Sequence, residues 1–287
     1  MNSFLGFFSA LVNPDFPFLR NALVAGFLSS VLFGVLGSIV TVKRIAGLAG
    51  AISHAVLGGI GIALYLSATG KVPGLQPMVG AIVFAVLAAG IIGFVSLKAK
   101  QREDTVINAI WAIGMSIGVL FMAKTPGYTD PSSYLFGNIL LISEQNLIML
   151  AVLDCIVVFL SWRFYPQIEA SSFDEEFAQV RGIPTQAVFL LILSTTAIAV
   201  VLLQTFVGIV MVIAMLTLPA GTAGYSARDL SGMMILGTIY ASLFSLGGLA
   251  TGWALDLPVG AMVVVIAGAV FLGTAVGKML VQHRRKS

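Results

Sequence analysis

Long apolar stretches separated by short polar segments follow one another along almost the whole chain. A helix that crosses the hydrocarbon core of a bilayer needs about 20 apolar residues. Nine stretches of about that length lie at residues 20–42, 47–67, 77–97, 105–123, 145–164, 186–203, 206–225, 231–250 and 259–281. The pattern predicts an all-α membrane protein, a polytopic bundle of about nine transmembrane helices that forms one domain over residues 1–287.

Two other segments have a pattern of their own. Residues 1–17 are apolar but interrupted by prolines, and they lack the basic start of a signal peptide, which predicts an interfacial lead-in on the outer side. The connection 124–144 contains an apolar run at 134–142 that is too short to span a bilayer. We expect a re-entrant or interfacial half-helix there.

The composition agrees with a membrane protein. Apolar residues make up 59% of the chain and charged residues only 9%, against about a quarter in soluble domains. This excludes soluble enzymes, nucleic-acid binders and disordered regulators. The single cysteine, Cys155, excludes a disulfide framework. The sequence contains no phosphate-binding loop and no nucleophile–base–acid set, so we expect no enzymatic activity and no ATP hydrolysis by the chain itself.

The positions of the basic residues predict the orientation. Lys and Arg prefer cytoplasmic loops. With the N-terminus outside and nine alternating helices, twelve of the fifteen Lys and Arg residues lie inside, and only Arg20, Lys71 and Lys124 lie outside. We therefore expect the N-terminus outside and a cytoplasmic tail at 282–287.

The connection 165–185 contains a short amphipathic helix, which we predict over Asp174–Arg181 within a cytoplasmic segment at 168–184. Ser172 and Glu175 fit a capping box, and Gly182 followed by Pro184 ends the helix. Its apolar face is formed by Phe173, Phe177 and Val180, and its polar face by Asp174, Glu175 and Glu176. The helix either lies in the headgroup layer or docks into a soluble partner. Interfacial helices usually carry a basic polar face, so the acidic face favours a protein partner.

His54 lies about ten residues beyond Lys43 and Arg44, or roughly 15 Å along a helix, and thus near mid-membrane. Ionisable groups at that depth are costly and usually face a pathway or a polar partner. His54 is therefore either satisfied by a hydrogen bond between helices or a ligand for a transition-metal ion, which neutral imidazole suits. The nearby Gly58 and Gly59 would allow another backbone to approach, or the helix to break.

Two aspartates are further candidates. Asp154 also lies near mid-depth, where it is either bonded to Ser, Thr or backbone groups or faces the same cavity as His54. Asp256, just before Pro258, is either a turn residue or helix N-cap, or a carboxylate at a pore mouth that attracts cations.

Close helix packing is predicted by two Gly-x-x-x-Gly patterns. They lie at Gly114–Gly118 and Gly273–Gly277.

At these residues the sequence resembles the permease subunits of bacterial ATP-binding-cassette (ABC) importers for manganese, zinc and iron(II). The similarity covers about residues 20–280. It is carried by Lys43-Arg44 before Ala51-Ile-Ser-His-Ala55, Arg102-Glu-Asp104, Tyr134-Leu-Phe-Gly-Asn-Ile-Leu140, Phe173-Asp-Glu-Glu-Phe-Ala178 with Gly182-Ile-Pro184, Val207-Gly-Ile-Val-Met-Val with Leu218-Pro-Ala220, and Asp256-Leu-Pro-Val-Gly260.

The resemblance implies a homodimeric pore in the bacterial inner membrane, with a metal-binding protein outside and ATPase subunits inside. It implies no permanently bound cofactor, a transported manganese, zinc or iron ion, and a metal site on the second helix, at His54. The ATPase would dock on cytoplasmic helices, here Asp174, Glu175, Glu176, Phe177, Arg181 and Gly182.

The chain departs from the family at two positions. The family commonly has Asp where Gly50 stands and often Pro where Gly58 stands; an Asp one turn before His54 would share its face and form a ready pair of ligands. We therefore expect metal to meet His54 from each protomer, with carboxylate help from Asp154 or Asp256. Packing and flexibility are expected from Gly50, Gly58, Gly59 and Pro219. The alternatives are the same architecture importing a metal chelate or other small solute, an ATP-independent secondary transporter, and a non-transporting membrane scaffold.

Overall fold

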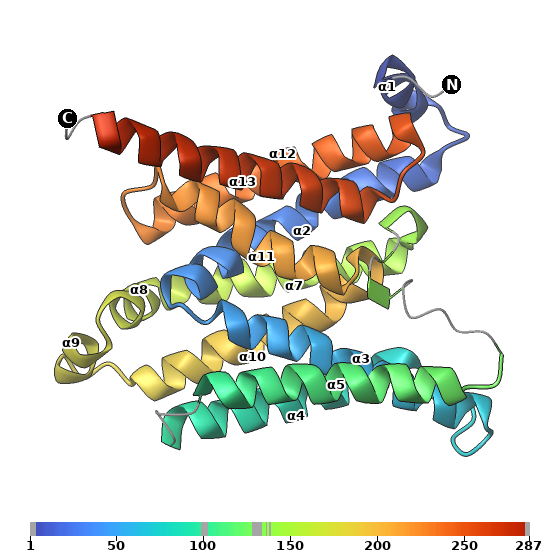
Figure 1. The fold of residues 1–287 in the computed structure, drawn as a ribbon, viewed down its shortest axis with the longest axis horizontal. Coiled ribbons are helices and arrows are strands. Elements are labelled where there is room, and N and C mark those ends of the chain that lie inside the picture. Colours follow the sequence, from blue (N-terminus) through green and yellow to red (C-terminus); the bar gives the residue numbers. More distant parts are fainter. Residues whose placement is uncertain (1–3, 99–102, 128–133, 136, 138, 285–287) are drawn as a thin grey trace. The chain divides into compact units, whose positions relative to one another are not determined.

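The computed structural model describes residues 4–98, 103–127, 134–135, 137 and 139–284, and all regular elements within this part of the chain are helices (Figure 1). In chain order they are α1 (Phe4–Val12), α2 (Pro17–Val42), α3 (Ala46–Ala68), α4 (Pro77–Lys98), α5 (Glu103–Lys124), the 3₁₀ turn η1 (Ile139–Leu141), α7 (Glu144–Arg163), α8 (Tyr165–Phe173), α9 (Glu175–Val180), α10 (Thr185–Val207), α11 (Ile209–Gly224), α12 (Leu230–Leu255) and α13 (Val259–Arg284). The prediction of a polytopic helical membrane protein is confirmed.

Each of the nine apolar stretches forms one helix. Eight of the helices in the described part are long and apolar enough to cross a membrane. The stretch at 206–225 forms the shorter helix α11, with 16 residues. Gly208 separates α11 from α10, and its φ of +83° is a conformation that favours glycine.

A hydrogen bond at the start of α12 shows that α11 also counts as a crossing. The backbone N–H of Ser231, the second residue of α12, donates to the hydroxyl of Tyr165, which follows Phe164, the C-cap of α7. The end of α7 and the start of α12 therefore lie on the same side. Because α10 crosses once between them, α11 has to cross back. This agrees with the predicted alternation of nine segments.

The helices form two compact units. Unit 1 comprises Met1–Lys43, Asn138–Phe173 and Ala214–Ser287, and in it α2 packs along α12, which also packs against α13. Unit 2 comprises Arg44–Gly137 and Asp174–Ile213, and in it α3 packs against α4, α5 and α10. In unit 2 α3 is the central helix, and 83% of its apolar window is buried.

Glycines bring the neighbours of α3 unusually close. A β-carbon built at Gly114 would lie 3.1 Å from the backbone nitrogen of Ala55, and one built at Gly118 would lie 2.6 Å from the backbone oxygen of Leu57. The close packing predicted for Gly114 and Gly118 is therefore confirmed. At Gly273 and Gly277 such an atom meets nothing within 4 Å among the described residues, so the prediction fails there, and both glycines lie on an open face of α13.

Replacing Gly59 tests how tightly α3 and α4 are packed. A β-carbon at Gly59 would lie 2.5 Å from the carbonyl carbon of Gly80, which belongs to the backbone and cannot move aside. We expect Gly59→Ala to destabilise the protein by about 1–3 kcal/mol through overpacking. Gly90→Ala on α4 is the matched control, because nothing lies within 4 Å of its β-carbon. Thermal unfolding in detergent should give a lower Tm for Gly59→Ala than for Gly90→Ala, and equal Tm values would contradict the packing.

The two segments with patterns of their own are partly visible. Residues 1–17 contain α1, which packs against α12 and α2 and buries Phe7 completely. The predicted half-helix at 134–142 falls partly outside the described residues. Its described part ends in the 3₁₀ turn η1, where Ile139 is buried.

Candidate functional site

The connection between α7 and α10 forms two helices, α8 and α9, where the sequence predicted one. The capping box of Ser172 and Glu175 is wrong, because Ser172 lies within α8 and its hydroxyl has no partner among the described residues. Asp174 is the N-cap instead, and its carboxylate accepts a hydrogen bond of 2.9 Å from the backbone N–H of Phe177. Gly182 ends α9 as predicted. Its φ is +80°.

The end of α9 forms a Schellman motif. The N–H of Ile183 donates to the carbonyl of Ala178, and the N–H of Gly182 donates to that of Gln179. α9 is therefore a short helix of six residues that is capped at both ends.

One side of α9 is packed and the other is exposed. Ala178 is fully buried, and the side chain of Gln179 donates a 3.0 Å hydrogen bond to the hydroxyl of Thr185 at the start of α10. Phe177 and Val180 are 53% and 87% exposed. The guanidinium of Arg181 lies over the Phe177 ring, 5.1 Å from its centre. This side of α9 thus carries exposed apolar side chains, of which Phe177 is partly covered by Arg181.

His54 lies in the first half of α3 and is only 8% exposed. Its Nδ1 atom lies 2.8 Å from the carbonyl oxygen of Gly50, one turn earlier. A carbonyl oxygen can only accept a hydrogen bond, so Nδ1 carries the proton, and in the neutral ring Nε2 keeps its lone pair. Such an arrangement is typical of metal-binding histidines, whose second nitrogen is held by a backbone carbonyl or a carboxylate.

The Trp111 indole stacks on the His54 imidazole, with ring centres 4.2 Å apart and planes 25° from parallel. The indole also covers Gly50, since a β-carbon there would lie 3.8 Å from Trp111. Trp111 is not among the residues predicted from the sequence. It lies one turn before Gly114, whose predicted close helix packing is the one signal in the sequence near Trp111, although that pattern does not identify α3 as the partner. The imidazole is therefore held by a backbone carbonyl and by an aromatic face.

The glycines after His54 allow the backbones of neighbouring helices to approach α3 closely, and they do not break the helix. α3 is continuous through Gly58 and Gly59. A β-carbon at Gly58 would lie 2.8 Å from the carbonyl oxygen of Gly114. Pro219 lies inside α11, where it removes one backbone donor from the helix.

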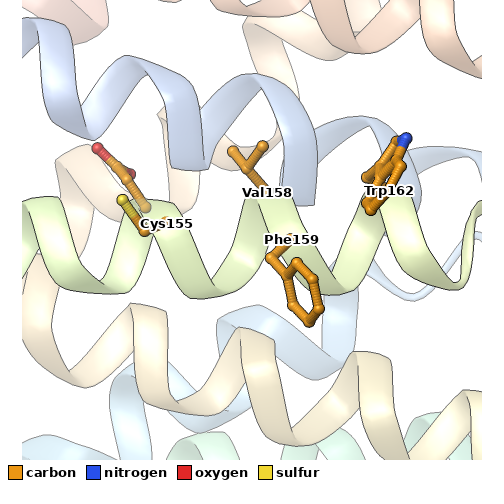
Figure 2. A pocket seen from close by; sticks show the side chains of 5 residues that line it. Cys155, Val158, Phe159 and Trp162 are labelled. Atoms are coloured by element: carbon orange, nitrogen blue, oxygen red, sulfur yellow. The ribbon is translucent and has the colours of Figure 1, made fainter.

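Asp154 lies in the middle of α7, in unit 1, and is 7% exposed. Neither of its carboxylate oxygens has a hydrogen-bond partner among the described residues. It lines a groove of about 400 Å³ together with Cys155, Val158, Phe159 and Trp162, whose side chains follow one another along α7 in Figure 2. Buried carboxylates are usually paired or bind cations. The other interpretation, an aspartate hydrogen-bonded to Ser, Thr or backbone groups, is not supported among the described residues.

Asp256 does not cap the last helix, which begins at Val259. It caps the end of α12 in a left-handed conformation with φ of +55°, and its N–H donates to the carbonyl of Gly252. Its side chain is exposed. Among the described residues no group of three or more His, Cys, Asp or Glu could hold a metal ion together. The described part of the chain therefore offers separate candidate ligands and no complete coordination sphere.

Comparison with known proteins covers nearly the whole chain. The model of the ABC 3 transport family matches residues 15–278. An uncharacterized membrane protein of Synechocystis sp., slr2045, is 36% identical over 259 residues, which cover 90% of each chain. The manganese transport system membrane protein MntC of Listeria monocytogenes is 32% identical over 258 residues, which cover 90% of this chain and 89% of MntC.

A solved structure has the same fold. A chain of PsaBC from Streptococcus pneumoniae, in complex with a Fab, superimposes with a TM-score of 0.81 at 28% identity, covering 94% of each chain. The resemblance predicted from the sequence motifs is thus confirmed, and the protein is a multi-pass membrane protein of a transport family. The chain belongs to the ABC 3 transport family.

Proposed function

We propose that the chain is the permease subunit of an ABC importer that moves a divalent transition-metal ion inward across the bacterial inner membrane. The observation that carries the proposal is His54. Its imidazole is buried on a membrane-spanning helix. The hydrogen bond from Nδ1 to the carbonyl oxygen of Gly50 leaves Nε2 available. A manganese transport system membrane protein that is 32% identical over 90% of this chain supports the same substrate class. Manganese, zinc and iron(II) are the candidate ions.

The proposed ligands form an incomplete site. Neutral imidazole alone offsets little of a divalent charge in low dielectric. We therefore assign the remaining ligands to His54 of a second copy of the chain, related by a two-fold axis, and to a carboxylate from Asp154 or Asp256. Incomplete coordination suits a site of passage, because an ion held by a full set of ligands would leave slowly.

Two soluble partners complete the proposed importer. Separate subunits hydrolyse ATP, since the chain has no phosphate-binding loop. They dock on α9, where Phe177 and Val180 are exposed next to an acidic first turn. A metal-binding protein delivers the ion on the outer side.

Metal accumulation in cells tests the proposal against its two main alternatives. Cells that lack their own metal importers would express the chain with or without its ATPase. We expect uptake of radiolabelled manganese, zinc or iron(II) only when both are present. Uptake by the chain alone would indicate an ATP-independent carrier. Uptake of a chelated metal but not the free ion would favour a chelate importer, which Gly50 in place of a carboxylate makes a specific alternative.

The proposed orientation makes a separate prediction. In a Cys155→Ser background, a cysteine at position 256 should react with an impermeant thiol reagent from outside the cell, and one at position 175 should not. Asp130 and Arg285, which lie outside the described residues, are expected outside and inside respectively. The reagent reaching position 175 in intact cells would overturn the orientation.

A further inference from the structure

Helix α8 is bonded at both of its ends to membrane-spanning helices of unit 1. At its first residue, Tyr165, the hydroxyl donates a 2.7 Å hydrogen bond to Glu169 and accepts a 3.1 Å hydrogen bond from the backbone N–H of Ser231 on α12. In its last turn, the carbonyl oxygen of Ser171 accepts a 3.0 Å hydrogen bond from the ammonium group of Lys43, the residue that caps α2. α8 thus bridges α12 and α2.

The bond to Ser231 fills a gap in the capping of α12. The first N–H groups of a helix have no partner within the helix. The N-cap Asp229 accepts from the N–H of Gly232 and from the Ser231 hydroxyl, so the Ser231 N–H is left to Tyr165. Burial, and then the hydrogen bond to Glu169, raise the pKa of Tyr165. The phenol therefore stays protonated and keeps both bonds.

The bond from Lys43 is favoured by charge. The last carbonyl groups of a helix carry partial negative charge and lack partners within the helix. The Lys43 ammonium supplies a charged donor to one of them, and hydrogen bonds with a charged partner are among the stronger ones in proteins. Ile168 and Ser171 are both buried, and α8 also packs against α2 and α7 within unit 1.

The two helices that α8 bridges are themselves closely packed. A β-carbon built at Gly34 of α2 would lie 2.6 Å from the Cα of Thr238 on α12, and one at Gly26 would lie 3.4 Å from the Cβ of Ser245. Interfaces of this density do not deform continuously. A displacement of α8 would thus be passed to α2 and α12 as a pair.

α8 is also covalently continuous with the proposed docking helix. Phe173 ends α8, and the next residue, Asp174, is the N-cap of α9. One residue, Asp174 in an extended conformation, separates the two helices. We propose that Tyr165 and Lys43 are positioning residues that couple the ATPase-docking segment to α12 and α2, so that movement of the ATPase reaches the membrane helices. This inference rests on the proposed function.

The test uses the complex of the full chain with its ATPase in proteoliposomes, and measures metal ions imported per ATP hydrolysed. Tyr165→Phe removes both hydroxyl bonds and keeps the ring. We expect ATP hydrolysis within about twofold of wild type and an import ratio that falls about tenfold, the effect of losing hydrogen bonds of this kind. Lys43→Met should act in the same direction, and Lys43→Arg, which keeps a charged donor, should restore the ratio.

Tyr225→Phe is the matched control. Its ring contacts Phe271 in the same unit, and no hydrogen bond of its hydroxyl is found among the described residues. A normal import ratio in Tyr165→Phe and Lys43→Met would overturn the inference and leave the proposed function intact. A loss of import that parallels a loss of Tm and of ATP hydrolysis would make these bonds structural and also overturn it. Absence of ATP-driven import by the wild type would overturn both.

Discussion

His54→Ala should abolish metal import, lowering it more than about 100-fold, without reducing the amount of folded protein in the membrane. The imidazole Nε2 is the nitrogen ligand that each copy of the chain contributes to the proposed site, so the substitution removes every proposed nitrogen ligand from the pathway. The truncation removes a buried ring that is stacked on Trp111, and the hydrogen bond that this ring makes among the described residues lies within α3. The loss of stability should therefore be limited to packing and leave no polar group on another helix unpaired. Initial rates of radiolabelled metal uptake, normalised to the amount of folded protein, measure the effect.

Ser53→Ala is the control for this substitution. Ser53 precedes His54 in α3, is fully buried, and donates its hydroxyl hydrogen bond to Ala49 in the same helix. The Ser53→Ala variant should import metal at a rate near that of the wild type. If His54→Ala loses stability instead and imports normally per amount of folded protein, the histidine is a packing residue and not a ligand.

Glu175→Lys combined with Glu176→Lys should uncouple import from ATP hydrolysis while the permease remains folded and inserted. Both residues lie in the first turn of α9, where acidic side chains also interact favourably with the helix dipole. Reversing both charges changes the net charge of the proposed docking surface by four units. We expect the ATPase to dissociate and import to fall at least about tenfold, because mutating charges at an interface weakens association in this range. Co-purification of the ATPase and the uptake rate measure the two effects.

A double variant in unit 1 controls for net charge. Asp15→Lys with Glu144→Lys makes the same change of charge at exposed positions that the proposed orientation places outside. It should assemble and import normally. If Glu175→Lys with Glu176→Lys also assembles and imports normally, α9 is a membrane-surface element and the docking proposal is wrong.

The membrane helices could be predicted closely from the sequence. α3 was expected at 47–67 and lies at Ala46–Ala68, and α13 was expected to begin at residue 259, where it does. The reason is that spanning helices must be about 20 residues long, apolar and bounded by charges or prolines. α10 is longer than expected because the helix continues to Val207 and ends only where Gly208 adopts a positive φ.

Short helices and long-range contacts were harder to predict. Ser172 and Asp174 are both good N-cap residues. The choice between them depends on α8, which packs against α2 and α7 and continues past Ser172 to Phe173. Trp111 reaches His54 from another helix, 57 positions later in the chain, and no local pattern encodes that pairing. The same holds for the bond between Tyr165 and Ser231, which joins residues 66 positions apart.

The most direct test of the account is ATP-driven metal import by the purified complex. The chain would be reconstituted with its ATPase and metal-binding protein in proteoliposomes, with radiolabelled manganese, zinc or iron(II) presented on the side of the binding protein and ATP on the other. The account predicts accumulation of at least one of these ions that requires ATP and stops in His54→Ala. Accumulation without ATP, or ATP-driven accumulation that is unchanged in His54→Ala, would contradict it.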